Sequence, residues 1–300
     1  MVRTFSLKKH VGTMFIFSCS CIEASAHIHS KLPKNCGLTR YHNARERIID
    51  GDIAALGQFP YLARIGKRTY VKSKPVYKFF CGGALISKYY IATAAHCKAS
   101  GNIVRLGEND VSTDRDCNRF GNCAPPVQDI EIQQFRVHRY DDDKIINDYG
   151  LIELKTPAEF NEYVQPICLP PAEMDHESCI GKWVSIAGFG RINTNPVEYA
   201  DKLQYITAPI INRKVCNHVY SKYNKKLTDT QFCIGHPKEK DSCNGDSGGP
   251  AIMSMNLDGR RRDYLIGVVS YGRPVCGTSP SVYTDVSRYV NWTMEKLYFG

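Results

Sequence analysis

The chain has 300 residues, of which 43% are hydrophobic, and its formal net charge is +9 at pH 7. This length and composition are typical of one ordinary globular domain with a sizeable core, preceded by a short leader. The 13 cysteines are numerous for the length and indicate an oxidising compartment. The sequence contains no recognisable nucleic-acid-binding module, so nucleic acid is not expected as a partner.

The N-terminal segment has the pattern of a secretory signal peptide. Lys8 and Lys9 precede an apolar stretch at residues 11–22, and Ala24-Ser25-Ala26 fits the small-residue cleavage pattern. A membrane anchor is the alternative, but the stretch is too short and is interrupted by serine and glycine. We therefore predict a signal peptide at residues 1–26 and an extracellular protein. No other segment is suited to span a bilayer, so no membrane partner is expected.

The segment 27–47 is polar and basic, contains one cysteine, Cys36, and has neither helical nor strand periodicity, so we interpret it as a propeptide. From Ile48 onward, short apolar runs alternate with turn residues at the spacing of an all-β barrel or sandwich. The clearest runs are 91–95, 103–106, 151–154, 184–187 and 265–270. Between residues 285 and 297 the apolar spacing becomes helical.

A cationic segment lies early in this region. Between Arg64 and Lys78 the chain has no acidic residue, and Tyr and Val residues are interleaved with the basic ones. The basic residues are Arg64, Lys67, Arg68, Lys72, Lys74 and Lys78. A solvated hairpin is the simpler interpretation. The alternative is an exosite for an acidic partner or a polyanion, because such clusters steer association.

Two further segments each contain a residue suited to proton transfer. Residues 91–97 are typical of a buried strand that presents His96 at its end, next to Cys97. Asp148 opens the apolar run 151–154, and a buried carboxylate without a partner is costly. A structural histidine and a strand-end turn are the alternatives for each segment taken alone.

The segment 241–250 reads Asp-Ser-Cys-Asn-Gly-Asp-Ser-Gly-Gly-Pro. A catalytic serine needs an activating base and stabilisation of the oxyanion that it creates. The glycines at 245, 248 and 249 permit tight turns, so the amides of Gly245 and Ser247 could point at one oxygen. A surface turn is the alternative, and it would be preferred for an isolated Gly-Asp-Ser. The length of the run and its Cys243 favour catalysis.

Together these segments give the chain order His96, Asp148, Ser247, which is the order of the chymotrypsin class. From Ile48 to the C-terminus the sequence closely resembles the trypsin-like serine proteases. The matching motifs are Ile48-Ile49-Asp50-Gly51, Cys81-Gly82-Gly83, Thr93-Ala94-Ala95-His96-Cys97, Asn147-Asp148, Gly188-Phe189-Gly190, the segment 241–250, Ser270-Tyr271-Gly272 and Val282-Tyr283-Thr284. The run Cys-Ala-Pro-Pro-Val-Gln at 123–128 resembles the protease part of arthropod clip-domain proteases, although the segment before Arg47 leaves no room for a clip domain.

The resemblance implies a protease domain at residues 48–300, with two six-stranded antiparallel β-barrels, a cleft between them and a C-terminal α-helix. It implies that His96, Asp148 and Ser247 are catalytic and that the amides of Gly245 and Ser247 form the oxyanion hole. No cofactor is then required for catalysis.

The resemblance also implies a zymogen. Cleavage of the bond between Arg47 and Ile48 would free an amine on Ile48, and this amine would pair with Asp246 and order the oxyanion loop. An upstream activating protease is therefore an expected partner.

Substrate selection follows from the same resemblance. Asp241 would lie at the base of the primary pocket and select Arg or Lys before the cut. Ser270, Gly272 and Ser281 would line this pocket. Relatives normally have glycine where this chain has Ser281, so its hydroxymethyl group should narrow the pocket close to Asp241.

By resemblance, the disulfides are Cys36–Cys168, Cys81–Cys97, Cys117–Cys123, Cys216–Cys233 and Cys243–Cys276. The first would keep the propeptide attached after activation. Cys179 is left over, and it could be a free thiol or a bridge to another molecule. We favour a buried or inert thiol.

Two further sites are suggested by short patterns. Glu108 and Asp110 follow Gly107 in a loop that binds calcium in many relatives, and their oxygen ligands suit that ion. Two carboxylates do not make a site, however, and an ordinary acidic loop is the alternative. Asn291-Trp292-Thr293 is a glycosylation acceptor pattern, which falls in the expected last helix.

The sequence therefore predicts a secreted zymogen endopeptidase that cuts protein substrates after Arg or Lys, with an inhibitor as a further partner. The propeptide cysteine and the clip-type loop favour an extracellular cascade role, immune or coagulation-like, or a venom component, over digestion. A non-catalytic homologue that acts as a binding cofactor is the alternative from another class. Such homologues usually lack part of the triad, which is intact here.

Overall fold

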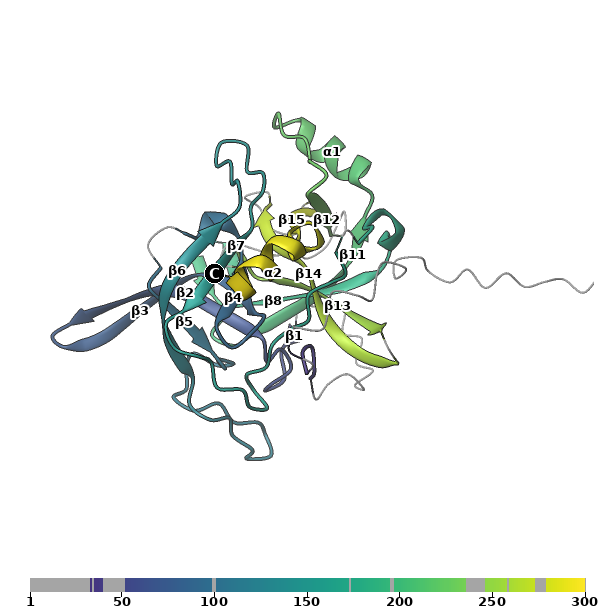
Figure 1. Cartoon of the computed structure of the whole chain (residues 1–300). Helices are drawn as coiled ribbons and strands as arrows, with labels where there is room; N and C mark the ends of the chain where they lie inside the picture. Colours follow the sequence, from purple (N-terminus) through teal and green to yellow (C-terminus); the bar gives the residue numbers. More distant parts are fainter. Residues whose placement is uncertain are drawn as a thin grey trace, which may run out of the picture.

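The computed structural model describes residues 33, 35–39, 52–98, 101–172, 174–194, 197–235, 246–257, 259–272 and 279–299. These residues form two β-structures that lie side by side, and the C-terminal helix packs against them (Figure 1). Within this part of the chain, no helix is long and apolar enough to cross a membrane.

The first β-structure is a closed barrel with the strand order β2-β3-β4-β7-β6-β5. Its strands are β2 Leu62–Val71, β3 Lys74–Leu85, β4 Tyr90–Thr93, β5 Ile103–Leu106, β6 Gln128–Val137 and β7 Gly150–Leu154. The apolar runs predicted from the sequence line its interior, where Leu85, Ile91, Leu106 and Leu151 are fully buried.

The second β-structure is a seven-stranded sheet with the order β1-β11-β12-β15-β14-β13-β8. Its strands are β1 Asp52–Ile53, β8 Trp183–Gly188, β11 Gln204–Ile211, β12 Gln231–Ile234, β13 Pro250–Leu257, β14 Arg260–Tyr271 and β15 Ser281–Asp285. Strands β8 and β11 also pair, from Gly188 opposite Gln204 to Trp183 opposite Pro209, which closes the sheet into a second barrel with β1 attached outside it. The predicted two-barrel fold is confirmed.

The remaining elements are short. They are the hairpin β9 Arg191–Thr194 and β10 Val197–Tyr199, the 3-10 turns η3 Ala95–Lys98, η4 Glu177–Cys179 and η5 Val286–Tyr289, and the helices α1 Arg213–Ser221 and α2 Val290–Phe299. The helical spacing predicted for 285–297 is borne out by η5 and α2. Asp285 caps η5 by accepting a hydrogen bond from the Ser287 amide. Val290 and Met294 of α2 join the core cluster that fills the first barrel and extends to Leu265 and Val268 of β14.

Four disulfides lie within the described residues, and they join the pairs expected by resemblance: Cys36–Cys168, Cys81–Cys97, Cys117–Cys123 and Cys216–Cys233. The fifth expected pair, Cys243–Cys276, lies outside the described residues. Cys179 is fully buried, as predicted, but it is disulfide-bonded. The interpretation of Cys179 as a free thiol is therefore wrong.

Candidate active site

His96 lies just beyond strand β4. The strand ends at Thr93, two residues earlier than the sequence predicts, and His96 lies in the 3-10 turn η3. Two contacts fix this turn on β3: the disulfide between Cys97 and Cys81, and a hydrogen bond of 2.8 Å from the Thr93 hydroxyl to the Gly82 carbonyl. The imidazole is therefore presented by a rigid support.

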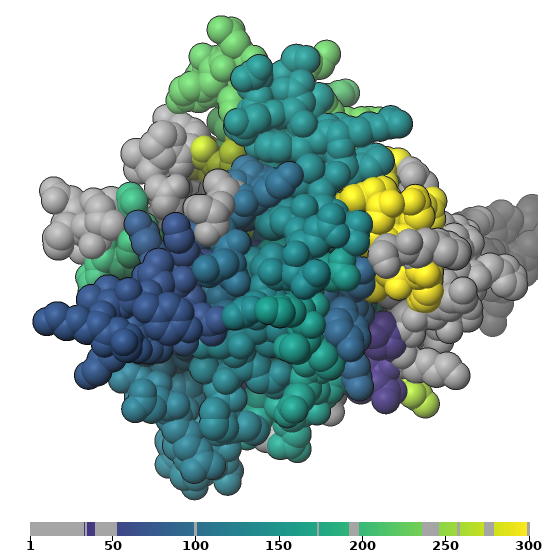
Figure 2. Space-filling model, turned by 60° about the vertical axis from the view of Figure 1, so that its left-hand side comes forward, coloured from purple at the N-terminus to yellow at the C-terminus, as the bar shows by residue number. Residues whose placement is uncertain are grey.

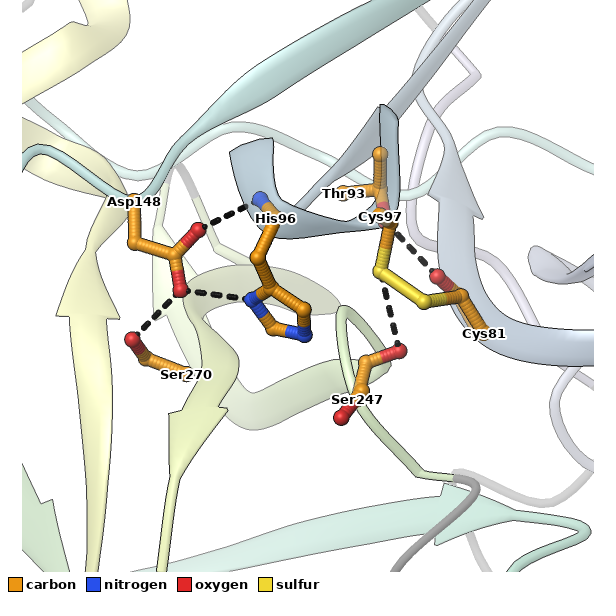
Figure 3. The surroundings of a disulfide bond; sticks show 8 residues. Cys81, Thr93, His96, Cys97, Asp148, Ser247 and Ser270 are labelled. Carbon is orange, nitrogen blue, oxygen red and sulfur yellow. Dashed lines mark hydrogen bonds and ion pairs between the residues drawn. A yellow bond between two sulfur atoms is a disulfide. The ribbon is translucent and has the colours of Figure 1, made fainter. Parts of the chain in front are cut away.

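Asp148 contacts His96 at two points. Its Oδ2 atom lies 2.8 Å from Nδ1 of the imidazole, and its Oδ1 atom accepts a hydrogen bond of 2.9 Å from the His96 backbone amide (Figure 3). The Asp148 side chain is fully buried, whereas 27% of the His96 side chain is exposed. A carboxylate at Nδ1 favours the tautomer with its proton on Nδ1, which leaves Nε2 to accept a proton.

Ser270 and Thr284 hold Asp148 from the second barrel. The Ser270 hydroxyl donates a hydrogen bond of 2.6 Å to Asp148 Oδ2, and the Thr284 hydroxyl donates one of 2.8 Å to the Asp148 carbonyl. The sequence predicts Ser270 only as a lining residue of the substrate pocket, and it does not predict this contact with Asp148. No local signal could reveal it, because the two residues lie 122 positions apart.

Asn147 and Tyr289 set the backbone before Asp148. Asn147 has a φ of 56°, in the left-handed region that asparagine tolerates better than most residues. Its side-chain oxygen accepts a hydrogen bond of 2.9 Å from the Tyr289 hydroxyl of η5. The C-terminal segment thus contributes to the position of Asp148.

Ser247 lies in a turn that the glycines around it make possible. The Ser247 carbonyl accepts a hydrogen bond of 2.8 Å from the Gly82 amide, and the Gly248 amide donates one of 2.8 Å to the Val269 carbonyl. Gly248 has a φ of 75°, and a Cβ atom at this position would collide with the Thr93 hydroxyl. Only glycine fits there, so the turn depends on it.

The imidazole of His96 lies between Asp148 and Ser247 (Figure 3). Among the described residues, no hydrogen bond joins the Ser247 hydroxyl to the imidazole. Hydrogen bonds between catalytic groups are often long without substrate and tighten when it binds. The arrangement is suited to a nucleophile, a neighbouring base and a group that orients the base.

The side chain of Asp246 packs against the backbone of the β8–β9 connection. Its Oδ1 atom accepts a hydrogen bond of 2.9 Å from the Gly190 amide, and a Cβ atom at Gly188 or Gly190 would collide with the carboxylate. Arg47 and Ile48, the predicted activation residues, lie outside the described residues.

A cavity of about 420 Å³ lies beside Asp246, with walls from both barrels. Arg64, Lys78, Phe79 and Phe189 line it together with Asp246. The Arg64 guanidinium lies 4.4 Å from the ring centroids of both Phe79 and Phe189. Burial lowers the pKa of Arg64 to about 10, so this side chain is still cationic at neutral pH.

The predicted substrate pocket is described only in part. Asp241 and Gly245, which is predicted to contribute to the oxyanion hole, lie outside the described residues. Gly272 follows β14 and is exposed, whereas Ser281 begins β15 and is buried. A Cβ atom at Gly272 would lie 2.7 Å from Ser281 Oγ, so the Ser281 hydroxyl faces the Gly272 backbone. The two residues expected on the pocket wall therefore adjoin one another.

The two acidic residues predicted for calcium pair with different cations of the protein. Glu108 accepts a hydrogen bond of 3.2 Å from Arg105, which also binds both Asp129 oxygens, at 2.7 and 2.8 Å. Asp110 lies 3.4 Å from Lys202 Nζ. Burial raises the pKa of the Glu108 carboxyl. This donor set fits a guanidinium better than a metal ion, and calcium binding stays an untested prediction.

The predicted glycosylation acceptor lies at the start of α2. Asn291 is exposed, but the hydroxyl of Thr293 is buried and lies 3.0 Å from the Tyr149 hydroxyl. An enzyme that reads the whole pattern could reach Thr293 only before α2 packs against the barrel.

Comparisons with known proteins agree with this geometry. The family model described as Trypsin matches residues 48–293. The chain is 36% identical to phenoloxidase-activating factor 3 of Holotrichia diomphalia over 92% of this chain and 79% of that protein. It is 37% identical to the CLIP domain-containing serine protease HP8 of Bombyx mori over 88% of this chain and 72% of that protein.

A solved structure is also similar. The crystal structure of the Drosophila Grass clip serine protease of the Toll pathway superposes with a TM-score of 0.71 at 31% identity, covering 88% of this chain and 74% of that one. Fold, disulfides and relatives agree, and the chain belongs to the trypsin family of serine proteases.

Proposed function

We propose that this chain is the secreted zymogen of a serine endopeptidase that cleaves proteins after Arg or Lys. The observation that carries the proposal is the buried Asp148 carboxylate bound to His96 Nδ1, with the imidazole lying between Asp148 and Ser247 (Figure 3). A non-catalytic homologue would not need a nucleophile, a base and an orienting carboxylate in this order.

In the proposed reaction, Ser247 Oγ attacks the carbonyl carbon of the scissile peptide while His96 Nε2 takes the hydroxyl proton. His96 returns this proton to the leaving amine as the carbon–nitrogen bond breaks, and the acyl group stays on Ser247. Water then attacks the ester by the same route and releases the acid. Asp148 remains ionised and stabilises the imidazolium that forms in each step.

The oxyanion would be held by the amides of Gly245 and Ser247, and its formation would depend on Asp246. After cleavage between Arg47 and Ile48, the new amine on Ile48 would pair with the Asp246 carboxylate and order the loop. Loss of one oxyanion donor typically lowers kcat by about 10²–10³-fold, so an unformed hole would keep the zymogen nearly inactive.

The names of the relatives support a place in a proteolytic cascade. One is called a phenoloxidase-activating factor, and another is a clip serine protease of the Toll pathway. The substrate would then be another extracellular protein, with an upstream protease as activator and a protein inhibitor that presents Arg or Lys. The segment 1–26 would direct secretion and be removed, which leaves the propeptide 27–47 at the start of the zymogen. Digestion is the alternative role for the same activity.

The test is peptide hydrolysis by the protein cut between Arg47 and Ile48, using matched peptides with Arg, Lys, Phe or Glu before the scissile bond. We expect cleavage after Arg and Lys, abolished by Ser247→Ala. The Asp241→Ser variant should lose the preference for cationic residues, because the pocket loses its charge. Main cleavage after Phe would contradict the assigned specificity, and no cleavage by the cut protein would favour the non-catalytic homologue.

A further inference from the structure

The outer part of the β2–β3 hairpin projects from the first barrel (Figures 1 and 2). Strands β2 and β3 pair from Leu62 opposite Ala84 to Val71 opposite Lys74, whereas the pairing of β2 with β5 ends at Gly66. Residues 67–78 therefore form a two-stranded arm that has no strand pairing to the rest of the barrel within the described residues. Such hairpins are marginally stable in water by themselves.

The two faces of this arm differ in their contacts. Arg68 and Tyr77 are paired across the strands and lie on the same face. Arg68 binds Glu131 of β6 at 2.6 Å, and the Tyr77 ring centroid lies 4.6 Å from the Arg105 guanidinium of β5, so this face is directed at the barrel. The opposite face, here called the basic face, consists of Lys67, Thr69, Val71, Lys74, Val76 and Lys78.

The basic face contains like charges that repel one another and so destabilise the hairpin. Lys67 lies directly opposite Lys78, and like charges in this position are destabilising. Within the described part of the chain, neither they nor Lys74 forms an ion pair with an acidic residue. At the tip, Lys72 and Ser73 have φ values of 48° and 63°, where asparagine and glycine are preferred. These opposed lysines, and a turn without its preferred residues, both destabilise the hairpin. Features that reduce stability without a local benefit are typical of a functional surface.

The basic face leads directly to the active site. Lys78 lines the cavity beside Asp246. Three positions further along β3, Cys81 forms the disulfide with Cys97, which is adjacent to His96. At the outer end, Val71 and Val76 have exposed fractions of 58% and 45%. A chain segment that leaves the active site along β3 would thus meet lysines with apolar side chains between them.

We propose that the basic face binds an acidic, extended segment of the protein substrate. Carboxylates of that segment pair with Lys67, Lys74 and the tip residue Lys72, and an apolar side chain covers Val71 and Val76. A sulfated polysaccharide would match the charges but leave the valines exposed to water. This inference rests on the proposed function, because it supplies the binding surface for a substrate of the same enzyme.

The experiment measures binding in the full secreted chain with Ser247→Ala, so that its outcome does not depend on catalysis. The probe is a fluorescent peptide of alternating Glu and Leu, compared with a Gln and Leu peptide and with a sulfated oligosaccharide. The test variant is Lys67→Gln/Lys72→Gln/Lys74→Gln. The control is Lys182→Gln/Lys214→Gln/Lys222→Gln, which removes the same charge from exposed residues of the second barrel and α1.

We expect the Glu and Leu peptide to bind about tenfold more weakly to the hairpin variant, and the control variant to bind like the parent. The difference should shrink at about 0.5 M NaCl, because exposed charges are screened. Val71→Ser/Val76→Ser should also weaken this peptide. Equal loss in both lysine variants would overturn the proposal. So would binding of the oligosaccharide without the peptide, or a peptide affinity unaffected by the valine changes.

Discussion

At the scale of single residues, Ser281 stands where the resemblance to trypsin-like proteases predicts a glycine. Its side chain is buried, and its hydroxyl faces the backbone of Gly272 on the predicted pocket wall. The extra hydroxymethyl group takes space in a closely packed region. If Asp241 lies at the pocket base, the hydroxyl can also occupy one of its acceptor positions.

We expect Ser281→Gly to raise kcat/KM for an Arg peptide by about tenfold and for the matched Lys peptide by less. The rigid fork of arginine needs more room than the ammonium of lysine. Steady-state kinetics on the two peptides checks this result. An unchanged or lower kcat/KM for both would show that the serine does not obstruct the pocket.

The residues around His96 show what the sequence can and cannot predict. His96, Asp148 and Ser247 each lie in a motif that identifies them, and the structure brings His96 and Asp148 into contact. Ser270 also lies in a motif, yet its hydrogen bond to Asp148 crosses the two barrels and depends on how they pack. The pairing of Glu108 with Arg105 likewise forms only in the folded loop. In the sequence, the two acidic residues of this loop suggest a metal ion because their basic partners cannot be identified there.

At the scale of elements, residues 35–39, which belong to the predicted propeptide, are fastened to the second barrel by more than a disulfide. The Gly37 amide donates a hydrogen bond of 2.7 Å to the Pro166 carbonyl, and the Gly37 carbonyl accepts one of 2.9 Å from the Asp263 amide. Arg262 donates a further one of 3.0 Å to the Cys36 carbonyl. The covalent link between Cys36 and Cys168 is therefore accompanied by hydrogen bonds from the same segment.

We expect the activated protein to run as one species in a denaturing gel without reductant and to release a small peptide when reductant is added. The described hydrogen bonds from this segment to the rest of the protein include a fourth, of 2.9 Å, from the Thr39 hydroxyl to the Gln58 carbonyl. Four such bonds contribute about 4 kcal/mol net, which corresponds to only about a millimolar affinity. The variant Cys36→Ser/Cys168→Ser should therefore lose the peptide on gel filtration after activation, even under native conditions. Release of the peptide from the unreduced parent protein would show that the bond does not hold it.

Strand lengths were harder to predict than strand positions. The run 265–270 marks the buried half of β14, but the strand extends back to Arg260. The charged residues at its start pair with β13 in an exposed hairpin, where backbone hydrogen bonds rather than apolar burial define the strand. An apolar pattern indicates only the part of a strand that faces a core.

At the scale of the whole molecule, the candidate active site depends on the contact between the two barrels. His96 and Asp148 come from the first barrel, while Ser247 precedes β13 of the second (Figure 3). Ser270 and Thr284 reach from the second barrel to Asp148, and Gly82 of β3 binds the Ser247 carbonyl. The fold was predictable because its motifs are many and ordered. Strand β1, the seventh strand of the second sheet, was not predictable from an apolar pattern, because it has only two residues.

Activation at the bond between Arg47 and Ile48 tests the central claim most directly, because it links the motif at Ile48 to Asp246 and Ser247. The measurement is kcat/KM for one Arg peptide, determined for the secreted protein before and after this bond is cut. An Arg47→Ala variant that resists cutting serves as the control. We predict a rise of at least about a hundredfold on cleavage, because the oxyanion hole then forms, and a low value throughout for the variant. Full activity of the uncut protein, or of the Arg47→Ala variant, would contradict the account.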